Sequence, residues 1–157
     1  MEFEAQFWSV MKVAGAMLLG GLIGLEREVA SKPAGLRTHM LVTGSAALLV
    51  VLGDYMIQYY GNSSFVAAIQ TDPIRIMEAI ITGISFLGAG TIIFRRGDEI
   101  VEGLTTAASI LFASAIGIAV ALDQFLMGAI LTIMVVLILY VLGFIENWIE
   151  KFRKRLP

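Results

Sequence analysis

Cysteine is absent from this chain of 157 residues, and histidine occurs once. Without thiols the chain can form no disulfide and no thiolate metal centre, and one histidine excludes a histidine-rich zinc site. Charged residues are also scarce, at 15%, against about 25% in an average soluble domain. The net charge is −2, and basic residues mix with aromatics only in the C-terminal tail, so nucleic acid is not an expected partner.

Apolar side chains are what the chain has in abundance. They make up 58% of the residues, and the mean hydropathy is +0.85. A domain of this size keeps much of its surface exposed, so one core cannot bury all of them and lipid is the expected solvent. We therefore predict one integral membrane domain over residues 1–157. The acidic start, MEFEAQFW, and the long apolar run after it favour a first span over a cleaved signal peptide.

Long apolar windows predict an all-α bundle of five transmembrane helices. The windows cover about residues 7–25, 36–57, 74–94, 104–122 and 125–145. Each is close to the ~20 residues that a membrane helix needs, and none alternates like a barrel strand. Asp72-Pro73 is expected to begin the third helix, and turns are expected at Gly97-Asp98 and Asp123-Gln124.

Basic residues predict the orientation of the bundle. Nine of the eleven lysines and arginines fall in the first loop, the third loop and the tail: Arg27, Lys32, Arg37, Arg95, Arg96, Lys151, Arg153, Lys154 and Arg155. Because basic loops stay in the cytoplasm, the N-terminus is predicted outside and the C-terminus inside. Residues 146–157 form a basic amphipathic tail. We interpret it as an interfacial anchor, with a helix that docks a partner as the alternative.

Small residues recur at helical spacing, which predicts close packing between helices. The predicted packing positions are Gly20, Gly24, Gly83, Gly88, Gly90, Ala113 and Gly117. Such positions let helix backbones approach in lipid. They favour a compact bundle, or a bundle with an additional seam between copies, so we expect a homodimer or a higher homo-oligomer. Residues 130–140 are bulky and aliphatic and are expected to face lipid.

A polar stripe in the third window is the candidate cation pathway. With the acidic residues near the same predicted outer end, the pathway residues are Asp54, Asp72, Arg75, Glu78, Thr82 and Ser85. Arg75, Glu78, Thr82 and Ser85 recur every three or four residues and share one helix face. The carboxylate of Glu78 and the hydroxyls after it suit a hydrated Mg²⁺, and the acidic residues, with Asp123, concentrate cations. In the alternative, Arg75 pairs with Glu78 and the hydroxyls bond to their own helix, so no metal site is certain.

A mixed cluster lies on the predicted cytoplasmic side. Its members are Glu26, Arg27, Glu28, Arg37, Thr38, His39, Thr105 and Thr106. Charge-assisted hydrogen bonds among such groups indicate an interlock between helix ends, or a gate. His39 is interpreted as an interfacial residue, with a pH sensor as the alternative. Thr105 and Thr106 are candidate caps for the fourth helix.

Nothing in the chain indicates an enzyme. The glycine run at 83–90 is not followed by the lysine of a phosphate loop, and it lies inside a predicted span. A catalytic triad is also missing. We expect no cofactor, apart from Mg²⁺ as a substrate or ligand.

Five segments together resemble a known family. They are GGLIGLERE at 20–28, AGLRTHMLVTGSAAL at 34–48, DPIRI at 72–76, GISFLGAGTII at 83–93 and VEGLTTAASI at 101–110. In this order and spacing the chain resembles the MgtC/SapB family of bacterial membrane proteins. The resemblance implies a multi-pass protein of the bacterial inner membrane that is linked to magnesium homeostasis.

The resemblance implies two kinds of function. One is transport of a divalent cation, most plausibly Mg²⁺, or an accessory role in that transport. The other is a regulatory module that transports nothing and binds other membrane proteins, such as the ATP synthase membrane sector or a magnesium-transport ATPase. The best-known family members add a soluble ACT-like domain after the membrane part. This chain resembles a short form without it.

Overall fold

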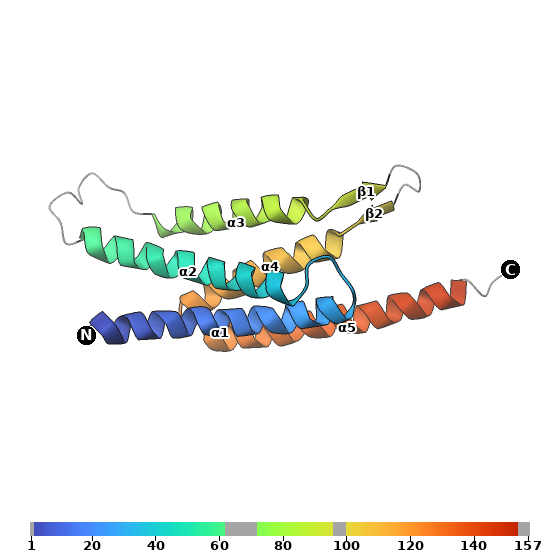
Figure 1. The fold of residues 1–157 in the computed structure, drawn as a ribbon, viewed down its shortest axis with the longest axis horizontal. Helices are drawn as coiled ribbons and strands as arrows, with labels where there is room; N and C mark the ends of the chain where they lie inside the picture. The colour runs from blue at the N-terminus through green and yellow to red at the C-terminus, as the bar shows by residue number, and fades with distance from the viewer. Residues whose placement is uncertain (1, 62–71, 96–99, 154–157) are drawn as a thin grey trace.

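A computed structural model of the chain describes residues 2–61, 72–95 and 100–153. Five helices and one short hairpin make up this part (Figure 1). The helices are α1 (Glu2–Val29), α2 (Leu36–Gly61), α3 (Pro73–Ala89), α4 (Leu104–Ala121) and α5 (Phe125–Arg153). Strand β1 (Ile93–Arg95) pairs antiparallel with β2 (Ile100–Glu102), with Phe94 opposite Val101. The helical class predicted from the apolar runs is confirmed, with the hairpin as an addition.

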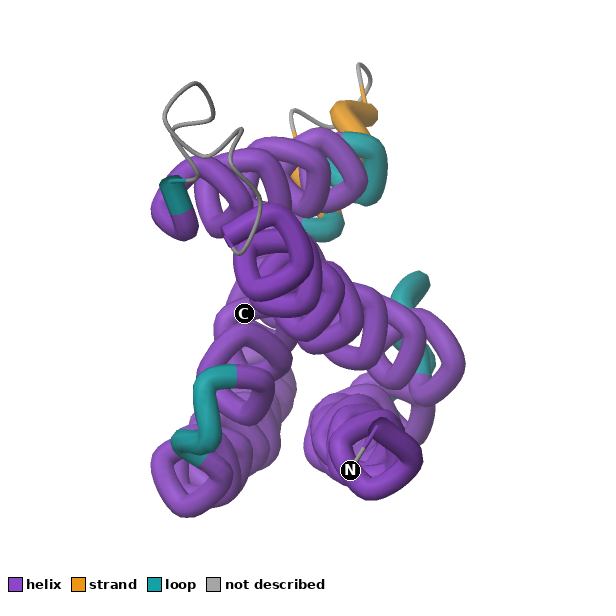
Figure 2. Tube along the Cα trace, turned by 90° about the vertical axis from the view of Figure 1, so that its left-hand side faces the viewer, coloured by secondary structure: helices purple, strands orange, loops and turns teal. Residues whose placement is uncertain are grey.

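The chain starts and finishes at opposite ends of the bundle (Figure 1). We call the end that holds the start of α1, the end of α2 and the α4–α5 turn the N end. The opposite end, with the α1–α2 loop, the hairpin and the end of α5, is the C end. Seen from the N end, α3 lies at the edge of the bundle (Figure 2).

Four helices are long and apolar enough to cross a membrane. The stretches are Phe3–Val29, Leu36–Tyr59, Leu104–Ala121 and Phe125–Ile145. Helix α3 has 17 residues and is not among them. These four helices were found among the residues that the structure describes. Membrane-spanning helices are therefore supported at four of the five predicted windows.

The predicted end of the third window, at residue 94, is wrong. Helix α3 finishes at Ala89, where Thr91 Oγ1 donates a hydrogen bond to Gly88 O at 2.7 Å. The next apolar residues extend and pair with β2 instead of continuing the helix. Gly103 then starts α4 with φ +92°, a backbone that favours glycine. The predicted turn at Gly97-Asp98 lies outside the described residues.

Capping explains where several helices begin and end. Asp72 Oδ1 accepts a hydrogen bond from Ile74 N at 3.0 Å and Pro73 follows it, so the predicted start of α3 is confirmed. Asp123, at φ +64°, makes the predicted tight turn between α4 and α5. The N-cap of α4 is Gly103, with no side-chain cap bond. The capping role predicted for Thr105 and Thr106 is therefore wrong.

The core lies where α1, α2 and α4 meet. Ile23, Ile110 and Ile116 are fully buried there. Helix α5 packs on this core through one edge, which includes Thr132 and Val135. Its other side chains, such as Leu137, are exposed, as expected of a helix that faces lipid.

Thr43 of α2 is the point of closest approach between the three core helices. A Cβ atom on Gly117 of α4 would overlap the Thr43 carbonyl oxygen, and one on Gly20 of α1 would lie 2.6 Å from His39 O. Thr43 Oγ1 donates to that same His39 oxygen at 2.7 Å. On α1, a Cβ on Gly24 would lie 2.7 Å from the Leu36 Cα. Glycine at these positions is what allows the helices to touch.

The other predicted packing residues divide into two groups. Ala113 is fully buried, and a Cβ on Gly88 would make an ordinary 3.5 Å contact with Ala107. A Cβ on Gly83 would meet nothing within 4 Å, and one on Gly90 would meet carbonyl oxygens of its own helix. Within one described chain, Gly83 and Gly90 therefore pack against no other helix.

Replacing Gly117 with alanine tests the contact at Thr43. Gly117→Ala is expected to destabilise the protein by about 1–3 kcal/mol, because the new methyl group meets backbone that cannot move aside. The control is Gly143→Ala on α5, where a Cβ meets nothing within 4 Å. Thermal unfolding in detergent, followed by circular dichroism, measures the difference. Equal melting temperatures for the two variants would contradict the packing account.

Candidate functional site

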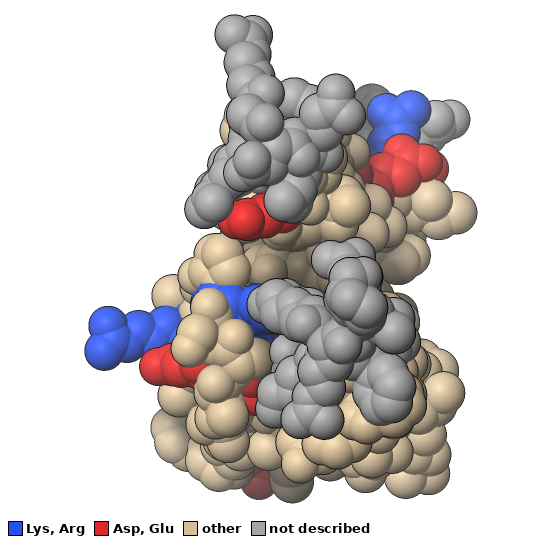
Figure 3. All heavy atoms as spheres, turned by 90° about the vertical axis from the view of Figure 1, so that its right-hand side faces the viewer, with Lys and Arg blue, Asp and Glu red and all other residues tan. Residues whose placement is uncertain are grey.

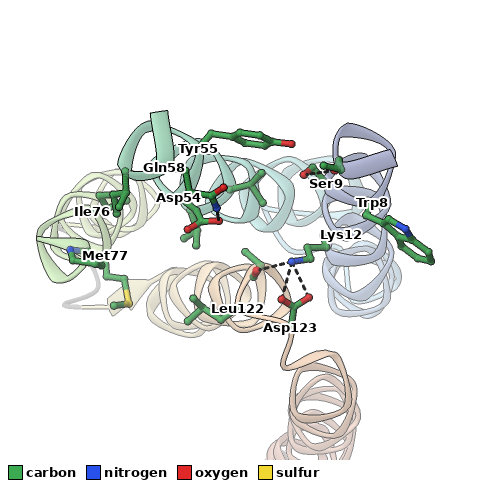
Figure 4. Close-up of a pocket in the computed structure, with 16 residues that line it drawn as sticks. Trp8, Ser9, Lys12, Asp54, Tyr55, Gln58, Ile76, Met77, Leu122 and Asp123 are labelled. Carbon is green, nitrogen blue, oxygen red and sulfur yellow. Dashed lines mark hydrogen bonds and ion pairs between the residues drawn. The ribbon is translucent and has the colours of Figure 1, made fainter. Parts of the chain in front are cut away.

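A cavity of about 600 Å³ lies at the N end, between α1, α2, α3 and the end of α4 (Figure 4). Apolar side chains such as Val51, Ile76 and Leu122 form much of its wall. Its polar lining comes from three helix regions and comprises Ser9, Lys12, Asp54, Gln58 and Asp123. The cavity therefore joins an apolar wall to a small set of oppositely charged groups.

Lys12 binds oxygen atoms at the end of α4. Its Nζ lies 2.7 Å from Asp123 Oδ1 and 2.8 Å from Oδ2, and it donates to Ala121 O at 3.5 Å (Figure 4). The last carbonyls of a helix lack intrahelical partners and form the negative end of its dipole. The Asp123 carboxylate adds a full negative charge. We call these Ala121 and Asp123 oxygens the oxygen corner, and the Lys12 ammonium is the cation that it holds.

The ion pair at the oxygen corner is open to water. The Lys12 side chain is 31% exposed and that of Asp123 is 74% exposed. Ion pairs so exposed contribute little to stability, since water and salt screen them. The Lys12–Asp123 pair therefore contributes little to holding α1 against the end of α4.

Asp54 supplies a second carboxylate to the same cavity. Its Oδ2 accepts a hydrogen bond from Gln58 Nε2 at 2.7 Å, and Figure 4 shows both side chains beside the space that Lys12 enters from α1. The described residues contain no cluster of three or more His, Cys, Asp or Glu that could ligate a metal directly. Two carboxylates and a carbonyl instead suit a hard cation that keeps several of its waters, as Mg²⁺ does.

The structure separates the predicted pathway residues. Asp54 lines the cavity, while Asp72 serves as the cap of α3. Arg75, Glu78, Thr82 and Ser85 all lie on the exposed side of α3, opposite its buried Ile80. Within a single chain they do not line the cavity.

Sequence reasoning missed Lys12 as a site residue. A signal for it exists, because a charged side chain inside an apolar window is functional by default. Its partner was not visible, since 111 residues separate Lys12 from Asp123.

At the C end, His39 links α2 to α4. It is fully buried, with Nδ1 3.0 Å from Gly35 O and Nε2 3.0 Å from Ser109 Oγ. A carbonyl only accepts, so we assign the proton of the neutral ring to Nδ1, and Nε2 then accepts from the Ser109 hydroxyl. That hydroxyl also lies 2.8 Å from Thr106 O. Ser109 therefore has two competing acceptors.

The remaining members of the predicted cytoplasmic cluster form separate contacts. Arg27, 4% exposed, donates from Nη2 to Glu26 Oε1 at 2.8 Å. Glu28 Oε2 accepts from Leu36 N at 2.8 Å and so caps α2. Three further members, Arg37, Thr38 and Thr105, are exposed or half-buried. Where the structure describes this end, basic and acidic side chains lie next to each other (Figure 3).

The chain is similar to proteins of a known family. The model of the MgtC family matches residues 13–148, which confirms the resemblance inferred from the five segments. No solved structure matches the chain.

Three relatives illustrate the match. The chain is 45% identical to "Protein MgtC" of Brucella abortus over 106 residues, which is 68% of this chain and 39% of that protein. It is 36% identical to "Protein SapB" of Bacillus subtilis over 110 residues, 70% of this chain and 46% of that one. It is 33% identical to "Putative magnesium transporter YhiD" of Escherichia coli over 132 residues, 84% and 59% of the two chains. The chain thus spans at most about three-fifths of these relatives.

Ser109→Ala tests the link between α2 and α4. Losing the hydroxyl leaves His39 Nε2 buried without its partner, so we expect a destabilisation of about 1–3 kcal/mol. The control is Ser114→Ala in the same helix, which is equally buried but donates to Leu111 O of its own helix. Melting temperatures in detergent give the comparison. A loss in Ser114→Ala as large as that in Ser109→Ala would argue against the link.

Proposed function

This chain belongs to the MgtC family, and on that premise we propose that it serves magnesium homeostasis by binding a divalent cation in its N-end cavity. The proposal places it in the bacterial inner membrane, with all five helices spanning, the N end outside and the C end in the cytoplasm. It is not an enzyme, and Mg²⁺ is its substrate or ligand rather than a resident cofactor. The name of the E. coli relative supports the choice of magnesium.

The distribution of charge supports this orientation. Among the described residues, Arg27, Lys32 and Arg37 lie at the C end, whereas Lys12 and Arg75 lie near the N end. Basic residues favour the cytoplasmic side. Helix α3 is short for a span, but 17 residues rise about 25 Å. That length crosses most of the ~30 Å hydrocarbon core.

The oxygen corner is the observation that carries the proposal. It already holds a cation, the Lys12 ammonium, on the Asp123 carboxylate and the Ala121 carbonyl. A divalent ion carries twice the charge of the ammonium and interacts more strongly with the same oxygens. Asp54 faces the same cavity and adds a second carboxylate. We propose that Mg²⁺, with part of its water shell, displaces Lys12 and lies between Asp123 and Asp54.

Transport is the first candidate use of this site. A cation that moves beyond the cavity meets the contact of Gly20 and Gly117 on Thr43, so transport requires α1, α2 and α4 to separate there. In the structure the helices are in contact at Thr43, which favours a second candidate function. In it, the chain senses the cation at the N end and regulates other membrane proteins, such as a magnesium-transport ATPase or the ATP synthase membrane sector.

A tryptophan beside the cavity gives a direct binding assay. Trp8 lines the cavity and Trp148 does not, so Trp148→Phe leaves one reporter. In lipid nanodiscs we expect Mg²⁺ to change Trp8 fluorescence saturably at constant ionic strength. Asp123→Asn and Asp54→Asn, made on this background, should weaken the apparent affinity by about tenfold or more, roughly 1.4 kcal/mol per factor of ten. Lys12→Met should strengthen it several-fold, because the competing ammonium is gone.

The variants also serve as each other's controls. All three change one charge in the same cavity, yet Lys12→Met and Asp123→Asn are expected to act in opposite directions. If both variants change the apparent Mg²⁺ affinity in the same direction, or if the Trp8 fluorescence change does not saturate, the proposed site is wrong.

Magnesium flux into proteoliposomes separates the two candidate functions. If the chain transports Mg²⁺, we expect a flux that Asp123→Asn reduces. Across the variants, the flux should then follow the order of the apparent Mg²⁺ affinities measured at Trp8. Saturable binding at Trp8 without any flux would reject transport and support the regulatory candidate.

A further inference from the structure

Helix α3 presents a polar face away from the bundle. Its inner side packs through Ile80 and Gly88, which are buried. Arg75, Glu78, Thr82 and Ser85 occupy the opposite side and are exposed. Both views place α3 at the edge of the bundle, so this face lies on its outer surface (Figures 1 and 2). We call these four residues the α3 polar face.

The α3 polar face lacks partners in the described part of its own chain. In the described part of the chain, Arg75 and Glu78 form no ion pair, although they lie one helical turn apart. Nor does a hydrogen bond join Thr82 or Ser85 to another described group. By contrast, the buried hydroxyl of Thr132 donates to its own helix at 2.8 Å. The pairing that the alternative sequence interpretation predicted for this stripe is therefore not formed.

Such a face is unfavourable against lipid. Hydrocarbon offers no hydrogen-bond partner, and polar side chains at membrane depth, here Thr82 and Ser85, turn towards protein or water. The exposed surface of α5 is apolar, as at Ile133 and Leu137, whereas that of α3 combines polar residues with apolar ones such as Phe86. If α3 spans the bilayer as proposed, its outer face needs a polar cover while that of α5 does not.

We infer that a second copy of this chain covers the α3 polar face. Two copies in one membrane share their orientation, so a two-fold axis along the bundle sets α3 beside α3. Residues of the same number then lie at the same height, and the Arg75 side chain of each copy reaches along the axis to Glu78 of the other, since three residues along a helix differ by about 4.5 Å in height and arginine spans that distance. The face carries one positive and one negative group and is complementary to itself, as an isologous interface requires.

Side-chain size on the same face agrees with this occupant. Ala89 continues the stripe four residues after Ser85 and is exposed, and Ala79 flanks the stripe on one side. Small residues allow two helices to approach until hydroxyls such as that of Ser85 can bond across the seam. The seam also completes the polar stripe that one chain leaves open, because Thr82 and Ser85 of both copies then face each other.

Cysteine cross-linking tests the seam in the full chain. The protein has no cysteine of its own, so a single introduced thiol reports one position. Ser85→Cys, which is nearly isosteric, should form a covalent dimer in liposomes under mild oxidation. Ile133→Cys on the exposed side of α5 is the control and should stay monomeric. On the Ser85→Cys background, Glu78→Arg should reduce the dimer several-fold, since it places arginines against each other.

A charge swap makes the test decisive. Adding Arg75→Glu to Glu78→Arg restores one charge of each sign per face, so cross-linking should recover; recovery excludes misfolding as the cause of the loss. Three results would overturn the seam. They are cross-linking at Ile133→Cys equal to that at Ser85→Cys, no covalent dimer of Ser85→Cys at any protein-to-lipid ratio, and a charge swap that does not restore the dimer yield. Labelling of the Ser85→Cys thiol by a membrane-impermeant maleimide would also overturn it, because α3 would then face water.

The inference rests on the proposed insertion of α3 in the bilayer but not on cation binding. The Trp8 titration reads the cavity between α1, α2, α3 and the end of α4, whereas cross-linking reads the outer side of α3. If Ser85→Cys does not cross-link but Mg²⁺ changes Trp8 fluorescence as expected, only the seam is rejected. If Ser85→Cys cross-links but Trp8 does not respond to Mg²⁺, only the cavity proposal is rejected.

Discussion

The contact of α1 and α4 on Thr43 of α2 is the constraint on which the rest of the structure depends. Gly20 and Gly117 approach Thr43 from the two neighbouring helices, and neither has room for a Cβ atom. Association in lipid gains little from the hydrophobic effect, so close backbone contact and buried hydrogen bonds hold the helices together. The buried link from His39 to Ser109 joins α2 and α4 one turn of α2 nearer the C end. The three-helix core is therefore closed from Thr43 towards the C end.

The two ends of the bundle differ, because the N end holds a cavity and the C end is closely packed. Towards the N end the cavity begins at Val50, about two turns along α2 from Thr43. There the end of α4 exposes its last carbonyls, and Asp123 and Lys12 meet. Towards the C end, the cap of Glu28 on Leu36 N ties the end of α1 to the start of α2. A bundle with a cavity at one end and closely packed helices at the other suits the binding or sensing role proposed above.

Much of the fold could be predicted from the sequence, because long apolar runs and capping residues are local signals. Asp72, Pro73 and Asp123 marked helix boundaries correctly. The end of α3 was not visible, since Ile93 and Phe94 continue an apolar run and extend only because β2 pairs with them. The stripe from Arg75 to Ser85 was correctly grouped on one helix face, but spacing does not say whether that face turns inward. Likewise, the meeting of Lys12 with Asp123 is a tertiary contact between distant segments.

The central claim is that the oxygen corner exchanges its ammonium for a divalent cation. Anomalous scattering from Mn²⁺, which has the same oxygen preference as Mg²⁺, locates such an ion directly in crystals of the intact protein. We predict one strong peak in the N-end cavity between Asp123 and Asp54, with the Lys12 side chain displaced from Asp123. A cavity without a peak, and with the Lys12–Asp123 ion pair intact at saturating Mn²⁺, would contradict it.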